Sequence, residues 1–333
     1  MKFGPIPLSL ASGAILAHSV ALPQGRLRKG LVLEAEHIAA LEAAGNTDVV
    51  AAVLEPGDVD ENLAAERLAR ALVPDEAAAG IKRQAAFTGR VNLLADGPGV
   101  VSLDSDALLA LNSVHPMITL ATVPHWQQMQ DACMIGTVKI ISYAVPEGDL
   151  AACQLASGTL RLVPPTLMSA SLLVTDITGG AGVKGVEAIE NRLTALNVTL
   201  DDVTMTSHNE HELSAAISRV KSDLILILTG SATSDAFDIA PQALRQAGGI
   251  VTRFGMPVDP GNLLFLGDLK GIPVIGLPGC ARSPALNGVD WVLSRVVCGV
   301  PPTSEDIAGM GVGGLLKEIP TRPQPRRGKA SQS

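Results

Sequence analysis

The fold of this chain is decided by residues 224–288, which read LILILTGSATSDAFDIAPQALRQAGGIVTRFGMPVDPGNLLFLGDLKGIPVIGLPGCARSPALNG. In this stretch, three loops rich in glycine, proline and hydroxyl residues directly follow apolar runs. A short apolar run bounded by turn residues is typical of a strand that is buried on both faces of a parallel sheet. Ligands bind such sheets at the carboxyl ends of the strands, so the three loops are predicted to form a site for an anion.

The amino-acid composition argues against nucleic acids and membranes as partners. The chain has 333 residues and a formal net charge of -8, with 2% aromatic residues, which argues against nucleic acid as the main partner. Apolar residues make up 47%, but no apolar run reaches the roughly 20 residues that span a bilayer, so we expect no membrane partner. The N-terminal segment has prolines where a signal peptide would be continuously apolar. Four cysteines without CxxC spacing suit a reducing cytoplasm and predict neither a zinc site nor a disulfide framework.

The length fits two domains and a tail. Residues 1–165 read as an α+β domain with barrel-like strands, residues 166–300 as an α/β domain, and residues 301–333 as a C-terminal tail or linker. In the first domain we expect helices over Glu34–Ala44 and Asp58–Leu72 and strands over Ala86–Leu94, Gly99–Leu103 and Ile135–Val145. This domain shows no catalytic constellation.

In the second domain, expected strands and helices alternate along the chain. The expected strands are Leu172–Thr175, a strand near Val203, Leu224–Leu228, Ile250–Met256, Leu263–Gly267 and Pro273–Gly276; the expected helices are Val186–Leu196, Glu210–Val220, Ile239–Ala247 and Pro284–Val297. Repeated βα units with continuously apolar strands predict the α/β class, with a mostly parallel sheet and helices on both faces.

The first loop, Thr229–Asp235, combines small residues with hydroxyls and a carboxylate. Small residues let an anion approach the backbone, and the next helix would offer free N–H groups. A capped βα turn, with Ser234 or Asp235 as the N-cap, explains the same residues equally well. Asp238 would then be a partner of the helix dipole.

The other two loops are also open to two interpretations. The second, Val258–Asn262, is fully explained as a Pro-Gly turn. The third, Leu277–Ser283, precedes a predicted helix with Ser283 as N-cap and Pro284 at the first position, so that Arg282 would contact an anion at the helix start. The alternative is a surface arginine beside a capped helix. Cys280 lacks a histidine nearby in sequence and fits a packed thiol better than a nucleophile.

Two further motifs compete with these loops. Gly180–Gly185 matches GxGxxG, opens a predicted helix and is followed about 20 residues later by Asp201 and Asp202, as in a dinucleotide site. An oxidoreductase using this loop is therefore one alternative. His208 and His211 have metal-like spacing, but Asn209 also forms a helix-start signature there and a third ligand is missing.

Taken together, TGSATSDAFDIAPQALRQAGG, FGMPVDPGNLLFLGDLKGIPVIGLPG and the strand end Thr175-Asp176 resemble the molybdopterin-binding domain of the MoeA and MogA family, over about residues 170–299. That family shows a GGxSxGxxD loop, a KPGKP-type turn and an LPGNPxS loop in this order. The whole chain also looks like the N-terminal half of proteins that fuse such a domain to a MobA-like nucleotidyltransferase. Thr229 stands where the family has glycine, and Asp259 and Asn262 stand where the turn has lysines.

The resemblance implies a MogA-like fold and a cytoplasmic protein that binds molybdopterin late in molybdenum cofactor assembly. The role would be metal insertion, as in a molybdopterin molybdenumtransferase, or hand-over to a nucleotidyltransferase, with Mg²⁺ and a nucleotide as further ligands. A non-catalytic cofactor-binding scaffold is the alternative. A nucleotidyltransferase, a molybdoenzyme or a second copy of the chain in a homodimer would be the partner.

The same resemblance, together with the loop pattern, predicts the site residues. Asp238 is the predicted catalytic residue. The predicted cofactor-binding residues are Thr175, Asp176, Thr229, Gly230, Ser231, Ala232, Asp235, Pro278, Gly279, Cys280, Arg282 and Ser283. No metal ligand is predicted.

Overall fold

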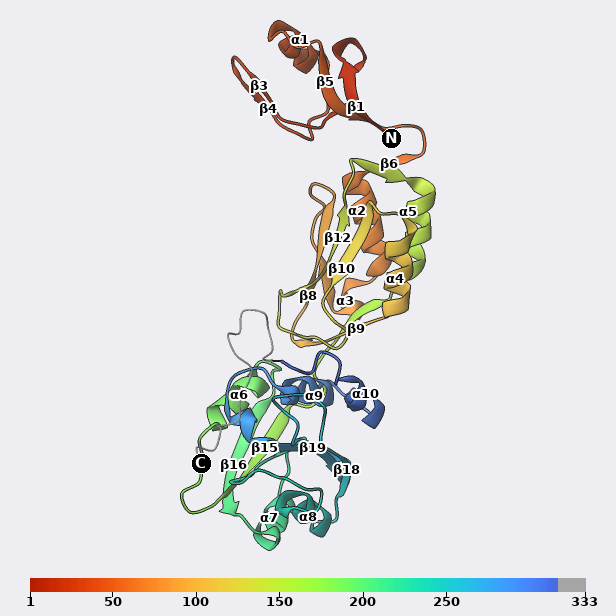
Figure 1. Ribbon diagram of the computed structural model, residues 1–333. Helices are drawn as coiled ribbons and strands as arrows, with labels where there is room; N and C mark the ends of the chain where they lie inside the picture. Colours follow the sequence, from red (N-terminus) through yellow and green to blue (C-terminus); the bar gives the residue numbers. More distant parts are fainter. Residues whose placement is uncertain (317–333) are drawn as a thin grey trace, which may run out of the picture. The chain divides into compact units, whose positions relative to one another are not determined.

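The computed structural model describes residues 1–316, and these residues divide into two compact units (Figure 1). Within residues 1–316, unit 1 comprises Met1–Gly97 and Val101–Leu162, and unit 2 comprises Pro98–Val100 and residues 163–316.

Unit 2 is built on a six-stranded, mostly parallel sheet. Its elements are β15 (Ser169–Asp176), α6 (Val186–Thr194), β16 (Thr199–Ser207), α7 (Glu210–Ile217), β17 (Leu224–Leu228), α8 (Ile239–Gln246), β18 (Ile250–Phe254), β19 (Phe265–Leu269), β20 (Ile272–Leu277), the 3-10 turn η3 (Gly279–Arg282), α9 (Gly288–Val297) and α10 (Ser304–Gly309). The strand order is β16-β15-β17-β20-β19-β18. β19 pairs antiparallel with both of its neighbours, and the pairs among β16, β15, β17 and β20 are parallel.

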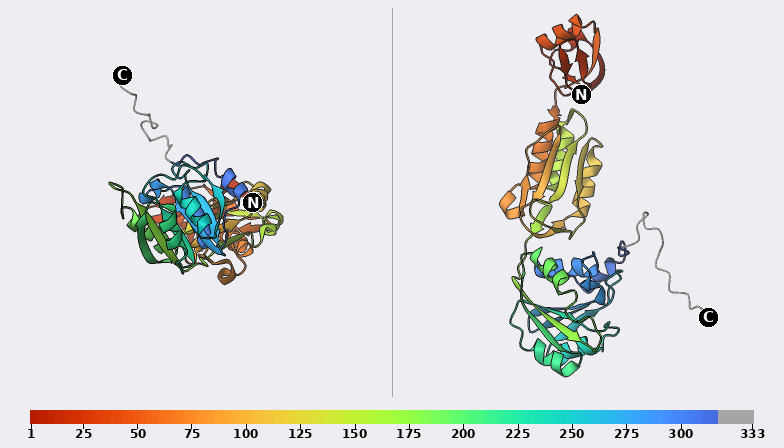
Figure 2. Two further views of the ribbon diagram at one scale, coloured as in Figure 1. Left: turned by 90° about the horizontal axis from the view of Figure 1, so that it is seen from below. Right: turned by 90° about the vertical axis from the view of Figure 1, so that its left-hand side faces the viewer.

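Alternate residues of the central strands pack against helices on opposite faces of the sheet. Leu226 and Leu228 lie in one core together with residues of α6, α9 and α10, whereas Ile225 and Ile227 lie in the other with residues of α7 and α8. Figures 1 and 2 show these two helix layers on either side of the sheet. Because both faces are covered, β17 is apolar at every position, as the sequence LILIL indicates.

Gly276 shows how closely the central strands pack. It lies opposite Phe265 in the β19–β20 pair, and a Cβ placed on it would lie 1.9 Å from the Phe265 ring. The ring is 1% exposed and occupies the space that any larger residue at position 276 would need.

Unit 1 contains several small sheets with helices and two hydrophobic cores. Its elements are β1 (Lys2–Pro7), η1 (Leu8–Leu10), β2 (Ile15–Leu16), β3 (Val20–Leu22), β4 (Gly25–Leu27), α1 (Ala35–Ala43), β5 (Asp48–Val53), β6 (Asp58–Asp60), α2 (Glu61–Leu72), α3 (Glu76–Ala79), β7 (Ile81–Arg83), β8 (Arg90–Ala95), β9 (Gly99–Leu103), α4 (Ser105–Val114), β10 (Ile118–Thr122), β11 (Gln128–Met129), β12 (Met134–Ile140), β13 (Ala144–Pro146), α5 (Glu147–Cys153), η2 (Gln154–Ala156) and β14 (Leu160–Val163). One core belongs to the segment from β1 to β5, and the other to the segment from β6 to β14. The predicted barrel-like strands are separate sheets, of which the largest is the antiparallel four-stranded sheet β10-β12-β8-β7.

Two details of the predicted helices differ in the structure. The helix predicted over Asp58–Leu72 begins at Glu61, and its buried stripe is formed by Ala64, Ala65, Leu68, Ala69 and Leu72. Within the expected tail, α10 is a folded helix whose Ile307 is fully buried in the core of unit 2. The Pro- and Arg-rich segment from residue 320 lies outside the described residues.

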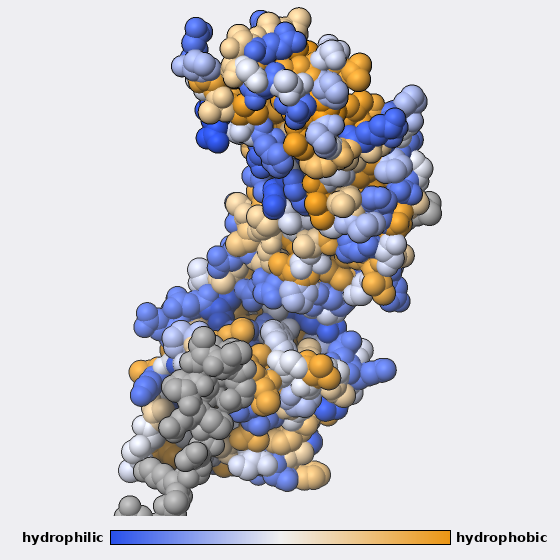
Figure 3. Space-filling view, turned by 45° about the horizontal axis from the view of Figure 1, so that its top comes forward, coloured by the Kyte–Doolittle hydropathy of each residue, from blue (hydrophilic) through white to orange (hydrophobic). Residues whose placement is uncertain are grey.

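Among residues 1–316, no helix is both long enough and apolar enough to cross a bilayer. On the face drawn in Figure 3, hydrophilic and hydrophobic residues are interspersed.

Candidate functional site

The predicted loops leave the sheet of unit 2 at one edge. β15 ends at Asp176, β17 at Leu228 and β20 at Leu277, and these strands are parallel and adjacent, so their carboxyl ends lie side by side. β16 is parallel to β15 and ends at the same edge, at Ser207. We call this edge the carboxyl edge.

A chain of hydrogen bonds connects three of these strand ends. His208, which follows β16, places Nδ1 2.8 Å from Oγ1 of Thr175 and Nε2 2.8 Å from Oγ of Ser231. The backbone N–H of Gly230 donates to Oγ1 of Thr175 at 3.0 Å. Gly230 approaches β15 so closely that a Cβ there would lie 2.9 Å from the Thr175 carbonyl oxygen. The structure therefore brings together the predicted site residues Thr175, Gly230 and Ser231, with His208 between them.

The first loop is held by its own side chains. Oγ1 of Thr229 donates to the carbonyl of Ser231 at 2.6 Å and lies 3.2 Å from Oγ1 of Thr233. Asp238 is the N-cap of α8, because its Oδ1 accepts from the N–H of Ile239 at 2.7 Å. Its Oδ2 accepts from the N–H of Ser234, in the first loop, at 2.9 Å. The predicted N-caps Ser234 and Asp235 were wrong.

The remaining predicted site residues of the first loop either bond to neighbours in the loop or are exposed. Asp235 accepts from the N–H of Phe237 at 2.8 Å, and Ala232 is exposed. Asp238, the predicted catalytic residue, uses one carboxylate oxygen to cap α8 and the other to bind the N–H of Ser234 in the first loop.

A hollow of about 770 Å³ lies beside this network at the carboxyl edge. It is lined by residues 176–183 of the glycine-rich loop, residues 205–207 at the end of β16, and Glu212. Hydrogen bonds from Ser207 and Asn209 hold the pKa of Glu212 below its usual value, so this carboxylate stays charged to lower pH. The hollow thus offers two carboxylates, those of Asp176 and Glu212, next to hydroxyls and bare backbone.

Arg282 connects the glycine-rich loop to the first loop. Its Nη1 donates to the carbonyls of Gly182, at 3.0 Å, and of Lys184, and its Nη2 donates to the carbonyl of Thr229 at 3.1 Å. Burial lowers the pKa of Arg282, while the charge of Asp176 acts in the opposite direction. The geometry thus shows Arg282 bound to backbone carbonyls of two neighbouring loops.

The third loop does not begin a helix where the sequence predicts one. Residues 279–282 form η3, and α9 starts at Gly288, with Asn287 and Asp290 forming a capping box. Ser283 and Pro284 therefore lie before the helix, which corrects their assignment as N-cap and first position. Pro278, Gly279 and Cys280 belong to this turn, and they are absent from the lining of the hollow.

Arg192 of α6 explains why the helix starts late. Its guanidinium donates to the carbonyls of Ala281, Ser283 and Ala285 at 2.9 to 3.1 Å, and it forms an ion pair with Asp290 at 2.6 Å. Carbonyls that bind Arg192 hold residues 281–285 in a loop, and the capping box starts the helix behind them.

The second loop lies against the chain near residue 315. The N–H of Asp259 donates to the carbonyl of Gly314 at 2.8 Å, and the N–H of Leu316 donates to the carbonyl of Asp259 at 3.0 Å. The N–H of Gly288 donates to the carbonyl of Pro260 at 2.8 Å, which joins the loop to the start of α9. This loop is absent from the lining of the hollow.

The dinucleotide fingerprint at Gly180–Gly185 lacks its acidic partner in space. Asp201 and Asp202 lie near the beginning of β16, whereas a carboxylate that binds a ribose must stand at the carboxyl end of that strand. Asp201 instead accepts from Ser222 at 3.2 Å, near the start of β17. The geometry does not support a dinucleotide site here.

The histidine pair does not form a metal site either. His208 uses both ring nitrogens on hydroxyls, and Asn209 caps α7 by accepting from the N–H of Glu212 at 2.9 Å. Within residues 1–316, the cluster of three side chains close enough to share a metal ion is Glu34, Glu36 and His37 in unit 1. None of the four cysteines forms a disulfide.

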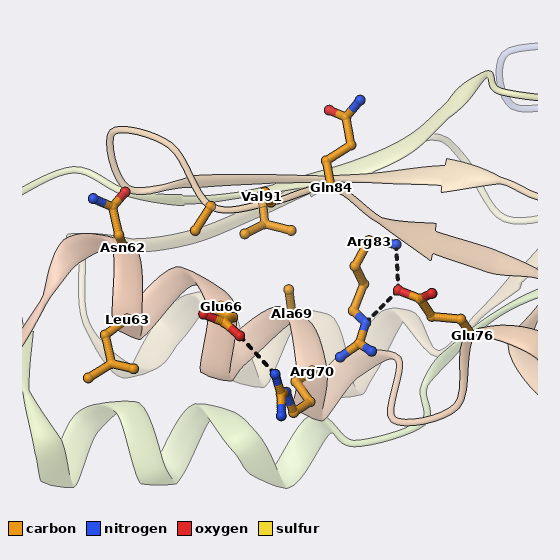
Figure 4. Close-up of a pocket in the computed structure, with 11 residues that line it drawn as sticks. Asn62, Leu63, Glu66, Ala69, Arg70, Glu76, Arg83, Gln84 and Val91 are labelled. Atoms are coloured by element: carbon orange, nitrogen blue, oxygen red, sulfur yellow. Dashed lines mark hydrogen bonds and ion pairs between the residues drawn. The ribbon is translucent and has the colours of Figure 1, made fainter.

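Unit 1 has a hollow of its own, of about 640 Å³, between α2 and the strands β7 and β8 (Figure 4). Its arginines are paired: Arg70 with Glu66 at 2.8 Å and Arg83 with Glu76 at 2.9 Å. Because each arginine is paired with a glutamate, these four side chains give the hollow no net charge with which to select a ligand.

The comparisons with known proteins give a distant likeness. A family described as a domain of unknown function, DUF8806, matches residues 5–53, in unit 1. No protein of curated function matches the chain. Among solved structures, the chain is similar to the molybdopterin biosynthesis MoeA protein from Pyrococcus horikosii, with 12% identity over 90% of this chain and 75% of that one and a TM-score of 0.31. It is also similar to a molybdenum cofactor biosynthesis protein from Pyrococcus furiosus, with 10% identity over 91% of this chain and 66% of that one and a TM-score of 0.26.

Proposed function

We propose that the carboxyl edge of unit 2 binds molybdopterin or a metal-bearing or nucleotide-linked form of it, as a step in late molybdenum cofactor assembly. The observation that carries the proposal is the convergence of the glycine-rich loop and the first loop, fixed together by Arg282, beside a hollow of about 770 Å³. At this edge, the first loop, the start of the third loop and the strand end Thr175-Asp176 belong to the segments that resemble the MoeA and MogA family, whereas the glycine-rich loop does not.

The lining of the hollow suits a polar ligand with a phosphate. Glycine positions 179, 180 and 182 leave the backbone open to close approach, and Thr178, Thr206 and Ser207 supply hydroxyl groups. An anion there faces the carboxylates of Asp176 and Glu212, so a divalent cation between phosphate and carboxylate is part of the proposal. Lys184, exposed in the same loop, supplies positive charge from the protein itself.

A titration with purified molybdopterin tests this role. Lys184→Ala should weaken binding by about 10- to 100-fold, the loss expected when a charge-assisted contact worth about 1.5–3 kcal/mol is removed. Lys221→Ala is the matched control, because Lys221 is an exposed lysine just before β17, at the opposite end of that strand from the first loop. Asp176→Asn should reduce the dependence of binding on Mg²⁺. Binding of NAD or FAD without binding of molybdopterin would refute the proposal.

A cofactor carrier without turnover is the second candidate function. Asp238 favours it, because one oxygen of its carboxylate caps α8 and the other binds the N–H of Ser234. Incubation of the protein with molybdopterin, molybdate and Mg-nucleotide distinguishes the two roles: product formation supports metal insertion or nucleotide transfer, and binding without product supports carriage. Hand-over to a nucleotidyltransferase or a molybdoenzyme would then be the purpose of binding.

A further inference from the structure

Ser231, His208 and Thr175 form a hydrogen-bonded row at the carboxyl edge. Oγ of Ser231 lies 2.8 Å from Nε2 of His208, and Nδ1 of His208 lies 2.8 Å from Oγ1 of Thr175. A hydroxyl, an imidazole and a third group that orients the imidazole are the parts of an activated nucleophile.

The row is both accessible and fixed. Ser231 is exposed and His208 is half-buried, so a substrate can reach the hydroxyl while the ring is partly enclosed. The backbone N–H of His208 donates to the carbonyl of Asp176 at 3.2 Å, and the carbonyl of Ser231 accepts from Thr229 at 2.6 Å. His208 and Ser231 are therefore fixed by hydrogen bonds of their backbones as well as of their side chains.

We propose that Ser231 is a nucleophile that accepts an acyl group from small polar carboxylic esters, with His208 as its general base. In the active tautomer Nδ1 carries the proton and donates to Oγ1 of Thr175, and Nε2 accepts from the Ser231 hydroxyl. Thr175 is a positioning residue, and it also accepts from the N–H of Gly230.

The chemical step balances with water as the only co-reactant. Oγ of Ser231 forms a bond to the ester carbon as its proton passes to Nε2 of His208. The bond from that carbon to the leaving oxygen then breaks, and His208 returns the proton to this oxygen, which releases the alcohol. Water attacks the acyl-serine with His208 again as base, which releases the acid and restores the serine.

The surroundings define the class of ester. Within residues 1–316, the backbone N–H groups of Ala232 and Thr233 donate to no acceptor, and they directly follow the nucleophile, where N–H groups that stabilise an oxyanion stand in serine hydrolases. Gly230 lies between Ser231 and the hollow that Asp176 lines. The glycines and hydroxyls that line this hollow suit a small polar acyl chain.

The test is acylation of the full chain by 4-nitrophenyl acetate, read as the mass added to the protein and located by peptide mapping. We expect one acetyl group on Ser231, with one equivalent of nitrophenol released as it forms. Ser231→Ala should abolish the adduct. Ser218→Ala is the control and should leave it unchanged, because Ser218 is exposed and its hydroxyl donates to the carbonyl of Ser214 within its own segment.

Variants of His208 and Thr175 distinguish a catalytic role of the row from a purely structural one. His208→Gln should slow acylation by about 100-fold or more, since general base catalysis contributes about 100- to 10,000-fold. Thr175→Ser should retain most of the rate and Thr175→Val should lose it, with the thermal midpoint of each variant measured alongside. Acetylation of Ser231 no faster than that of Ser218, or a rate unaffected by His208→Gln in folded protein, would overturn the proposal. Acylation is measured without pterin, so its outcome is independent of the proposed function.

Discussion

Arg192 is the residue whose removal should most destabilise the carboxyl edge of unit 2. All five of its N–H groups are used: four on the carbonyls of Ala188, Ala281, Ser283 and Ala285, and one on the carboxylate of Asp290. The side chain is 9% exposed and that of Asp290 is 17% exposed, so water replaces few of these contacts.

Arg192→Met should therefore lower the free energy of unfolding of unit 2 by about 3–5 kcal/mol, the cost of leaving one partner of a buried ion pair alone. Methionine preserves the apolar stem of the side chain, so most of the loss is that of the guanidinium. The free energy of unfolding of Arg192→Lys should lie between those of the unchanged protein and Arg192→Met, because an ammonium group has three donors and cannot reach five acceptors.

Urea unfolding followed by tryptophan fluorescence measures this loss. Trp291 of α9 reports on unit 2 once the other tryptophan is replaced, as in a Trp126→Phe background. With an m-value of about 2 kcal/mol/M, a loss of 4 kcal/mol lowers the midpoint by about 2 M. Arg219→Met is the matched control and should change stability by less than about 0.5 kcal/mol, because Arg219 is exposed and bonds within its own segment. A loss below about 1 kcal/mol for Arg192→Met would refute the reasoning.

Three further predictions follow from single contacts. Gly276→Ala should destabilise unit 2 by about 1–3 kcal/mol in the same urea assay, because the added methyl overlaps the Phe265 ring, and Phe265→Leu in the same chain should restore part of the loss. Gly185→Ala should weaken molybdopterin binding in titrations, since its backbone has φ +95° and the new Cβ would lie 2.6 Å from Cα of Arg282; unchanged affinity would count against a site at this edge. Hydrogen bonds from neighbouring backbone N–H groups lower the pKa of Asp223, so the stability it contributes is present above about pH 4 and is lost as the pH falls; Asp223→Asn should show a flatter acid limb in thermal melts from pH 2 to 7.

The sheet of unit 2 could be predicted because its strands and turns depend on residues that are close together in sequence. LILIL is apolar at every position since β17 is covered on both faces, and Lys270 and Gly271, with φ of 54° and 93°, form the tight turn between β19 and β20. The helices α7 and α8 also start within one residue of the predicted positions, at Glu210 and Ile239.

The start of α9 could not be predicted, because it depends on a residue far away in sequence. The segment Ser283-Pro284 carries a good helix-start signal by itself. Arg192, about 90 residues earlier, binds the carbonyls of this segment and delays the helix to Gly288. The role of His208 was missed for the same reason: its partners Thr175 and Ser231 are 33 and 23 residues away, and only the pairing of the parallel strands brings them together.

The two arginines of the carboxyl edge also determine how an anion can be bound there. Arg192 has no N–H group left, and Arg282 spends three of its five on loop carbonyls. These bonds order the loops before a ligand arrives, which reduces the entropy that binding would otherwise cost. Under the proposed function, the positive charge for a phosphate would come mainly from Lys184 and a divalent cation. Molybdopterin affinity should therefore fall steeply when Mg²⁺ is chelated, and a full affinity in the presence of a chelator would contradict this division of roles.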